Sequence, residues 1–144
     1  MQLENGRYTI QGVSLEDVCS EFGTPLYVYD AEKITQNYNE LKSAFKGADV
    51  HLKYACKALT NINVLKVLRK AGAGLDTVSI EEAKIGLAAG YEPHEILFTP
   101  NSVGFAEVEE AVELGLEINI DELSILEQFG SKYGNTKTCC IRLN

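Results

Sequence analysis

Two hydrophobic periods follow one another along this chain in a regular order. Short runs of β-branched and aromatic residues are typical of strands, and each is followed by a segment with apolar residues three or four positions apart, as on one face of a helix. The pattern therefore predicts strands alternating with helices from residue 26 onward. The expected strands are 26–29, 50–57, 75–78, 96–99, 117–120 and 138–143, and the expected helices are 31–45, 62–71, 80–90, 105–114 and 122–129.

Capping residues support these helix boundaries. Asp30 and Asp121 each precede an expected helix and can accept hydrogen bonds from its first N–H groups. Ser79 and Glu82 form a Ser-x-x-Glu capping box, and Gly72 follows the helix 62–71 as a typical stop. The helical residues expected to face the core are Ile34, Tyr38, Leu41, Phe45, Val64, Leu65, Leu68, Val108, Ala111 and Val112.

The expected strands recur at a constant spacing. Lys57, Val78, Thr99, Ile120 and Ile141 lie near the ends of five consecutive strands, each 21 residues after the one before. Strands joined by helices must run parallel, which leaves a (β/α)8 barrel or an open doubly wound sheet. Because no glycine-rich phosphate loop follows the early strands, and because the period is even, we expect the α/β fold of a TIM-type barrel.

Length and charge narrow the possible partners and location. A complete eight-unit barrel needs about 250 residues, so 144 residues cover only the first five strands of one. The formal net charge of -8 disfavours nucleic acid and anionic membranes as partners. The sequence has neither signal-peptide features at its start nor a run of about 18 apolar residues, so we expect a cytoplasmic protein.

The four cysteines are Cys19, Cys56, Cys139 and Cys140. They show no Cys-x-x-Cys or Cys/His spacing, and two of them are adjacent within an apolar run. We therefore expect reduced thiols in the core, with no disulfide and no metal site.

Lys57 ends a segment that otherwise has the composition of a buried strand. Alternation over residues 50–57 places His51, Lys53, Ala55 and Lys57 on one side and Val50, Leu52, Tyr54 and Cys56 on the other. In a barrel the apolar set packs under the helices, so Lys57 would lie at the mouth where barrel enzymes build active sites. A partly desolvated amine there can form a Schiff base with a carbonyl. The alternative is a strand-end lysine that extends into solvent.

Two further charged residues lie near strand ends. Asp76 is in the strand 75–78 and Arg142 is in the strand 138–143. If the sheet closes, both converge with Lys57 on one mouth and can orient an anionic cofactor. The alternative is that Asp76 and Arg142 form a structural ion pair.

Four motifs carry a family resemblance. They are Phe-Gly-Thr-Pro-Leu-Tyr-Val-Tyr-Asp at 22–30, Tyr-Ala-Cys-Lys-Ala at 54–58, Gly-Leu-Asp-Thr-Val-Ser at 74–79 and Phe-Thr-Pro-Asn at 98–101. Together they resemble the N-terminal part of the diaminopimelate decarboxylases. This family belongs to the fold-type III pyridoxal-phosphate enzymes, with the ornithine and arginine decarboxylases.

The resemblance implies a (β/α)8 barrel followed by a β-domain. Residues 1–30 would contribute a strand to the β-domain, and residues 31–144 would form the first part of the barrel. Lys57 aligns with the lysine that holds pyridoxal 5'-phosphate, Ala55 and Asp76 with residues that line its ring, and Arg142 with an arginine near the same site. The implied reaction is decarboxylation of meso-diaminopimelate to L-lysine by a homodimer of the full-length protein.

The resemblance also implies that the chain is an incomplete piece. The loops that bind the cofactor phosphate follow late strands of such barrels, so we expect the chain to be inactive alone. His51 and His94 are not expected to replace any family residue. Two alternatives stay open: another basic amino-acid decarboxylase or racemase of the same fold type, and a non-catalytic cofactor-binding remnant whose half-barrel pairs with a second copy.

Overall fold

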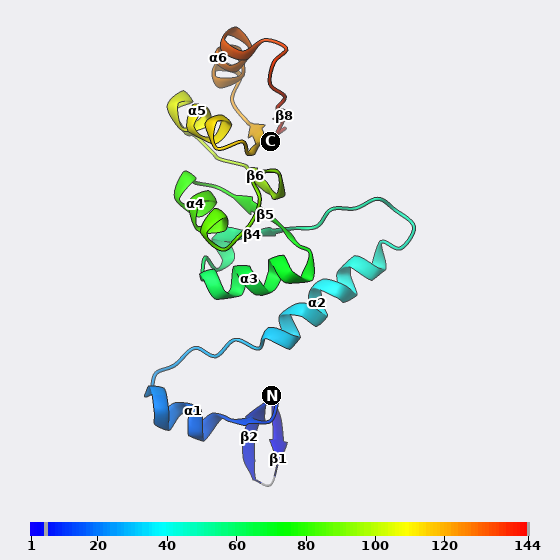
Figure 1. The fold of residues 1–144 in the computed structure, drawn as a ribbon, viewed down its shortest axis with the longest axis vertical. Helices are drawn as coiled ribbons and strands as arrows, with labels where there is room; N and C mark the ends of the chain where they lie inside the picture. The colour runs from blue at the N-terminus through cyan, green and yellow to red at the C-terminus, as the bar shows by residue number, and fades with distance from the viewer. Residues whose placement is uncertain (5, 144) are drawn as a thin grey trace.

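The computed structural model describes residues 1–4 and 6–143. It begins with a small antiparallel unit, followed by a long helix and a row of β/α units (Figure 1). The small sheet has the order β1-β2-β3 and is followed by one helix. Its elements are β1 (Gln2–Glu4), β2 (Arg7–Ile10), β3 (Val13–Ser14) and α1 (Leu15–Phe22).

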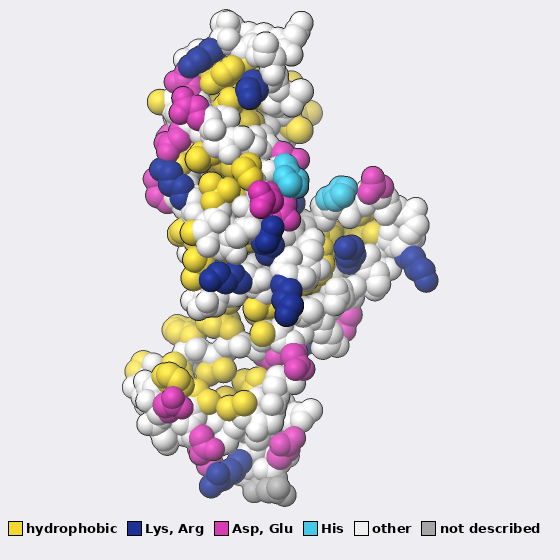
Figure 2. Space-filling model, in the orientation of Figure 1, with side chains coloured by type: hydrophobic (Ala, Val, Ile, Leu, Met, Phe, Trp, Pro, Cys, Tyr) yellow, Lys and Arg dark blue, Asp and Glu magenta, His cyan; other side chains and the backbone are white. Residues whose placement is uncertain are grey.

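The N-terminal unit has almost no core of its own. Within the described part of residues 1–30, Thr9 alone is buried, and its hydroxyl has no hydrogen-bond partner. Apolar side chains therefore lie on the surface of this unit, as the lower part of Figure 2 shows. The whole chain exposes 9393 Å², whereas a compact monomer of this mass exposes about 7,300 Å². The exposed apolar residues of the unit are Met1, Leu3, Tyr8, Val13, Phe22, Leu26, Tyr27, Val28 and Tyr29.

The strand expected at 26–29 is wrong. Residues 26–29 form no strand and are exposed along their whole length. A strand is stabilised by hydrogen bonds to a neighbouring strand, and no described strand pairs with this segment. Its aromatic and β-branched residues favour an extended backbone, but the described part of the chain contains no neighbouring strand to pair with it.

The rest of the chain forms a parallel sheet with helices on one face (Figure 1). The five strands follow sequence order, β4-β5-β6-β7-β8, and every neighbouring pair is parallel. This is the (β/α) progression expected for the first strands of a barrel. None of the described helices is long and apolar enough to cross a membrane. The elements are α2 (Ala31–Ala44), β4 (Lys53–Ala55), η1 (Cys56–Ala58), α3 (Ile62–Ala71), β5 (Gly74–Thr77), α4 (Ile80–Ala88), η2 (Pro93–Glu95), β6 (Ile96–Phe98), α5 (Phe105–Glu113), β7 (Glu117–Ile120), α6 (Leu123–Tyr133) and β8 (Cys140–Ile141).

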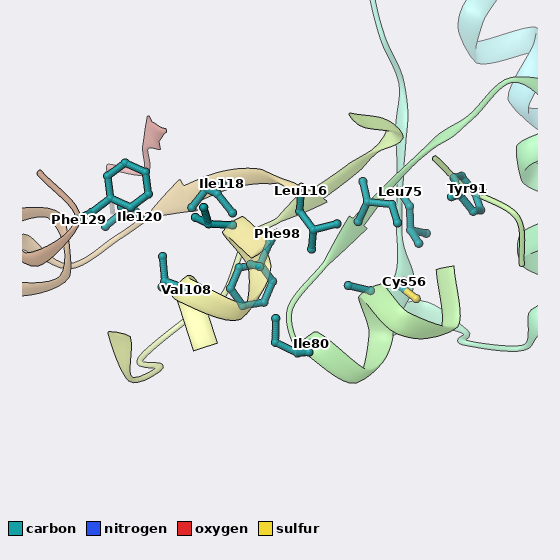
Figure 3. Packing of buried hydrophobic residues seen from close by; sticks show 14 of the residues in the cluster. Cys56, Leu75, Ile80, Tyr91, Phe98, Val108, Leu116, Ile118, Ile120 and Phe129 are labelled. Atoms are coloured by element: carbon teal, nitrogen blue, oxygen red, sulfur yellow. The ribbon is translucent and has the colours of Figure 1, made fainter. Parts of the chain in front are cut away.

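The core lies between the sheet and the helices α3 to α6. Alternate residues of β5, β6 and β7 are buried, because one face of the sheet packs under the helices. In Figure 3 Phe98 lies near Ile80 and Val108, which come from α4 and α5. The expected inward residues of α3 and α5 are confirmed as buried, whereas on α2 only Tyr38 is buried and Leu41 and Phe45 are exposed.

Three of the expected caps, Asp30, Ser79 and Gly72, are confirmed, and one is wrong. The Asp30 carboxylate accepts a hydrogen bond from the Lys33 N–H at 3.0 Å, and Ser79 Oγ accepts one from the Glu82 N–H at 3.2 Å. The last helix begins two residues after Asp121, which does not cap it. The N-cap there is Glu122, without a side-chain hydrogen bond, because the last strand-to-helix turn is one residue longer than the pattern suggested.

Two expected strands are shorter than the apolar runs that predicted them. The first covers Lys53–Ala55 rather than 50–57, because the backbone turns into the 3-10 helix η1 at Cys56. The last covers Cys140–Ile141 rather than 138–143. Alternation in a sequence shows which residues can share a face, but a ladder forms only where a neighbouring strand lies within hydrogen-bonding distance.

The strand register departs once from the 21-residue period. Leu75 pairs with Ile96, and Ile120 pairs with Ile141, as the period requires. Between β6 and β7 the paired residues are 20 rather than 21 positions apart in the sequence, so that Phe98 lies opposite Ile118. Because side chains alternate, a one-residue shift decides which face a residue occupies. It brings Thr99 into register with Asn119, a polar partner.

At the amino end of the sheet, an ion pair joins β4 to β7 across the two strands between them. Lys53 Nζ lies 2.9 Å from Glu117 Oε2 and donates to the Glu95 carbonyl oxygen at 3.4 Å. The lysine side chain passes over Gly74, where an added Cβ would lie 2.9 Å from Lys53 Cγ. Gly74 is therefore required by the close approach of this side chain.

We expect Gly74→Ala to destabilise the chain by about 1–3 kcal/mol, because the new methyl group would overpack against Lys53 and the Glu95 carbonyl. The matched control is Gly130→Ala inside α6, where nothing lies within 4 Å of the added Cβ. This change should stabilise by about 0.5–1 kcal/mol. Urea midpoints measure both, and shifts of the same sign would contradict the prediction.

Candidate functional site

The predicted site residues lie at the carboxyl ends of three strands. Ala55 is the last residue of β4 and pairs directly with Asp76 of β5. Lys57 follows two residues later, in η1, and is exposed. Arg142 directly follows β8, where its backbone N–H donates to the Ile120 carbonyl oxygen at 2.8 Å. Lys57, Asp76 and Arg142, which are far apart in the sequence, thus lie at the same end of one sheet.

A row of hydrogen bonds crosses this end of the sheet. The Thr99 hydroxyl donates to Asp76 Oδ1 at 2.6 Å, and Asn119 Nδ2 donates to Thr99 Oγ1 at 2.9 Å. All three side chains belong to half-buried residues on consecutive strands. We call Asp76, Thr99 and Asn119 the polar row. It lies on the face of the sheet that the helices do not cover, because Leu75, Thr77, Ile118 and Ile120 occupy the other face.

Among the residues that it describes, the structure does not contain the Asp76–Arg142 ion pair that the sequence left open as an alternative. Across residues 1–4 and 6–143, no ion pair joins Asp76 to Arg142. The Asp76 carboxylate is instead held by the neutral hydroxyl of Thr99. Asp76 and Arg142 therefore do not neutralise each other.

Lys57 is exposed and forms no ion pair within the part of the chain that the structure describes. Lys57 follows Cys56, which is 0% exposed and anchors the turn in the core. Within the described chain no carboxylate lies at ion-pairing distance from the Lys57 amine. These residues fit an aldehyde cofactor. The Lys57 amine suits its reactive carbonyl, and the small Ala55 and the Asp76 carboxylate, one oxygen of which is bound by Thr99, suit its ring.

The cysteines differ from the expectation of four core thiols. Cys56 is buried, Cys19 and Cys139 are half-buried, and Cys140 is exposed, which corrects the prediction for that residue. Cys140 pairs with Asn119 and so lies on the uncovered face, where no helix packs. All four thiols are free. The pKa of the Cys56 thiol rises to about 11, chiefly because burial disfavours the thiolate and also because Glu82 and Asp76 are nearby.

We expect Cys140 to react with iodoacetamide first and Cys56 last at neutral pH. The thiolate is the nucleophile, and both burial and the raised pKa suppress it at Cys56. Peptide mass spectrometry over a time course measures the order, and urea should make the four rates converge. Fast labelling of Cys56 in the folded chain would contradict the packing described above.

Two residues of this site were missed by the sequence analysis. Thr99 was recognised as a strand end and as part of the motif at 98–101, but not as a site residue, and Asn119 was not considered. The available signal was the alternation within 117–120, where polar Glu117 and Asn119 alternate with buried Ile118 and Ile120. Their hydrogen bonds to one another depend on the register between β6 and β7, which no local pattern reveals.

The two histidines lie at the opposite end of the sheet. His51 and His94 line a hollow together with Lys53 and Glu117, at the amino ends of the strands. The cyan side chains in Figure 2 mark this region. Barrel enzymes place their chemistry at the carboxyl ends, so this hollow is separate from the polar row.

A comparison with protein families agrees with this geometry. The family model of the pyridoxal-dependent decarboxylases, pyridoxal binding domain, matches residues 31–144. The chain belongs to the pyridoxal-dependent decarboxylases. The match confirms the expected fold type and the pyridoxal-phosphate cofactor of the family. It begins at the first residue of α2, directly after the N-terminal unit.

Individual relatives make the likeness more specific. The chain is 40% identical over 125 residues to the diaminopimelate decarboxylase of Methanothermobacter thermautotrophicus, which covers 85% of this chain and 29% of the relative. A solved diaminopimelate decarboxylase from Methanocaldococcus jannaschii in complex with L-lysine is 30% identical, with a TM-score of 0.87 over 98% of this chain and 35% of that one. A lysine/ornithine decarboxylase from Vibrio vulnificus, in complex with putrescine, is 28% identical, with a TM-score of 0.80 over 90% of this chain and 35% of that one. The chain thus spans about a third of the length of these relatives.

Proposed function

We propose that this chain forms part of a pyridoxal-phosphate-dependent decarboxylase that converts meso-diaminopimelate to L-lysine. The observation that carries the proposal is the 40% identity to a diaminopimelate decarboxylase over 85% of the chain. The site residues support it, because Lys57 and the polar row lie at the carboxyl ends of parallel strands, where barrel enzymes bind their substrates.

Each residue has a distinct role in this proposal. The amine of Lys57 would hold the cofactor through its aldehyde until the substrate amine binds. Asp76 accepts a hydrogen bond or positive charge through the carboxylate oxygen that Thr99 does not engage. Ala55, paired with Asp76, leaves room beside it, and Arg142 offers a cation to an anionic group. When bound, pyridoxal phosphate supplies the electron sink for the bonding pair that departing carbon dioxide leaves behind.

The division of the chain is part of the same proposal. Residues 1–30 would belong to a β-domain, and residues 31–144 to the barrel. The near absence of buried residues in the N-terminal unit supports this division, because such a unit needs further chain to bury its apolar surface. The homodimer of the full-length protein and the cytoplasmic location stay predictions.

A second candidate is a decarboxylase of lysine or ornithine. The structural likeness to the Vibrio vulnificus enzyme, with a TM-score of 0.80, favours it specifically. The higher TM-score of 0.87 and the higher sequence identity favour diaminopimelate as the substrate. Lysine lacks the second carboxylate of diaminopimelate, and ornithine lacks that carboxylate and one methylene group, so the second carboxylate is the group that a substrate pocket would have to recognise.

Two chimaeras test the proposal. In one, this chain replaces the corresponding segment of the Methanothermobacter thermautotrophicus enzyme, and in the other that of the Vibrio vulnificus enzyme. We expect the first chimaera to release carbon dioxide from meso-diaminopimelate and to form L-lysine, because its site residues would meet compatible neighbours. Folded but inactive first chimaeras would contradict the proposal, and activity in the second alone would favour the lysine or ornithine candidate.

A further inference from the structure

Two side chains of the polar row have no role in the chemistry described so far. Thr99 directly follows β6 and Asn119 lies in β7, and neither is among the residues named above as holding the cofactor. They are nevertheless linked to Asp76, a proposed ligand. Asn119 donates to Thr99 at 2.9 Å, and Thr99 donates to Asp76 at 2.6 Å. The row joins three consecutive strands at the end of the sheet where Lys57 lies.

The row has a direction. The Asn119 amide nitrogen can only donate, so Thr99 Oγ1 accepts this bond and keeps its own proton for Asp76. A distance of 2.6 Å is within the range of a charge-assisted bond from a hydroxyl to a carboxylate. Asp76 Oδ1 is thereby engaged, whereas Oδ2 receives no hydrogen bond from the part of the chain that the structure describes. The carboxylate therefore has one oxygen engaged by Thr99 and one without a protein donor among the described residues.

The sheet fixes the position of the Thr99 hydroxyl. The Thr99 backbone N–H donates to the Thr77 carbonyl oxygen at 2.7 Å, which extends the β5–β6 ladder to this residue. Threonine is β-branched and has a restricted side-chain torsion. Asn119 lies within β7 and pairs with Cys140 on the far side. Asp76 is therefore oriented by groups that cannot easily turn away.

We propose that Thr99 and Asn119 are positioning residues that act through Asp76 and orient its free oxygen toward the cofactor bound at Lys57. The inference rests on the proposed function, because it requires that pyridoxal phosphate binds at Lys57. Its consequence is that capture of the cofactor depends on a hydroxyl and an amide that do not touch it.

The test measures capture of pyridoxal phosphate by the chimaera in which this chain replaces the corresponding segment of the Methanothermobacter thermautotrophicus enzyme, because this chain spans only 29% of that relative. Increasing concentrations of pyridoxal phosphate are added, borohydride reduces the adduct, and mass spectrometry quantifies the modified peptide containing Lys57. We expect Thr99→Val, which keeps the shape and removes the hydroxyl, to raise the half-saturating concentration about tenfold. Thr99→Ser should restore it to within about twofold, and Asn119→Ala should raise it about threefold, because Thr99 can still donate to Asp76.

A matched control distinguishes positioning from stability. Thr77 lies one residue after Asp76, is 0% exposed, and donates its hydroxyl to the Leu97 carbonyl oxygen on the helix-covered face. Thr77→Val should lower the urea midpoint and leave the half-saturating concentration unchanged in the folded chimaera. An equal effect of Thr77→Val and Thr99→Val on capture, or failure of Thr99→Ser to rescue it, would overturn the positioning role.

The experiment also separates this inference from the function on which it rests. If the unsubstituted chimaera is modified at Lys57 and Thr99→Val behaves like it, the positioning role fails and the proposed function stands. If modification is spread over surface lysines such as Lys42 and Lys132 instead, both the proposed function and the inference fail.

Discussion

Replacing Lys57 by alanine should abolish covalent capture of pyridoxal phosphate at this position and lower the activity of an active chimaera by on the order of 10³-fold or more, the scale seen when a covalent nucleophile is removed. The reason is that the amine forms the bond to the cofactor aldehyde, and no other group can replace it there. Lys57→Arg should fail equally, because the guanidinium stays protonated and is a poor nucleophile. Borohydride trapping followed by peptide mapping measures the first effect, and release of carbon dioxide measures the second.

The matched control for Lys57 is Lys66→Ala. Lys66 is also exposed, but it lies within α3, on the helical side of the sheet. This substitution should leave both cofactor capture and decarboxylation within about twofold of the unsubstituted protein, as is usual for a surface change away from the site. Retained capture and activity in Lys57→Ala would remove the basis of the proposed function.

Phe98→Ala should destabilise the chain by about 3–5 kcal/mol, the range for removing a buried aromatic ring. Phe98 is 0% exposed and is among the largest fully buried side chains, at the centre of the β6 contacts with α4 and α5 (Figure 3). The free energy of unfolding of small domains is about 5–15 kcal/mol, so this loss would be a large fraction of it. Urea unfolding followed by circular dichroism measures the shift in midpoint.

The control for Phe98 makes the same chemical change on the surface. Phe22, at the end of α1, is 67% exposed. Phe22→Ala removes a ring that contributes little burial, so the free energy of unfolding should change by less than about 0.5 kcal/mol. Equal shifts for the two variants would mean that the ring of Phe98 does not pack as the structure describes.

The site illustrates the difference between local and non-local information. Lys57, Asp76 and Arg142 could be selected from the sequence because charged residues near the ends of apolar runs are locally unusual. Thr99 and Asn119 could not, since a threonine and an asparagine in strands have many unremarkable explanations. Their importance becomes visible only when the shortened register between β6 and β7 places them opposite each other.

By itself, the sequence determined the order of β/α units from residue 50 onward, most of their helix boundaries and the buried faces of α3 and α5. These features follow from side-chain periodicity and capping, which act over a few neighbouring residues. Only the tertiary structure decided that residues 26–29 form no strand, that Cys140 is exposed, and that Asp76 bonds to Thr99 rather than to Arg142. Each of these depends on which distant segment lies alongside, and strand pairing and register are set by contacts across the sheet rather than along the chain.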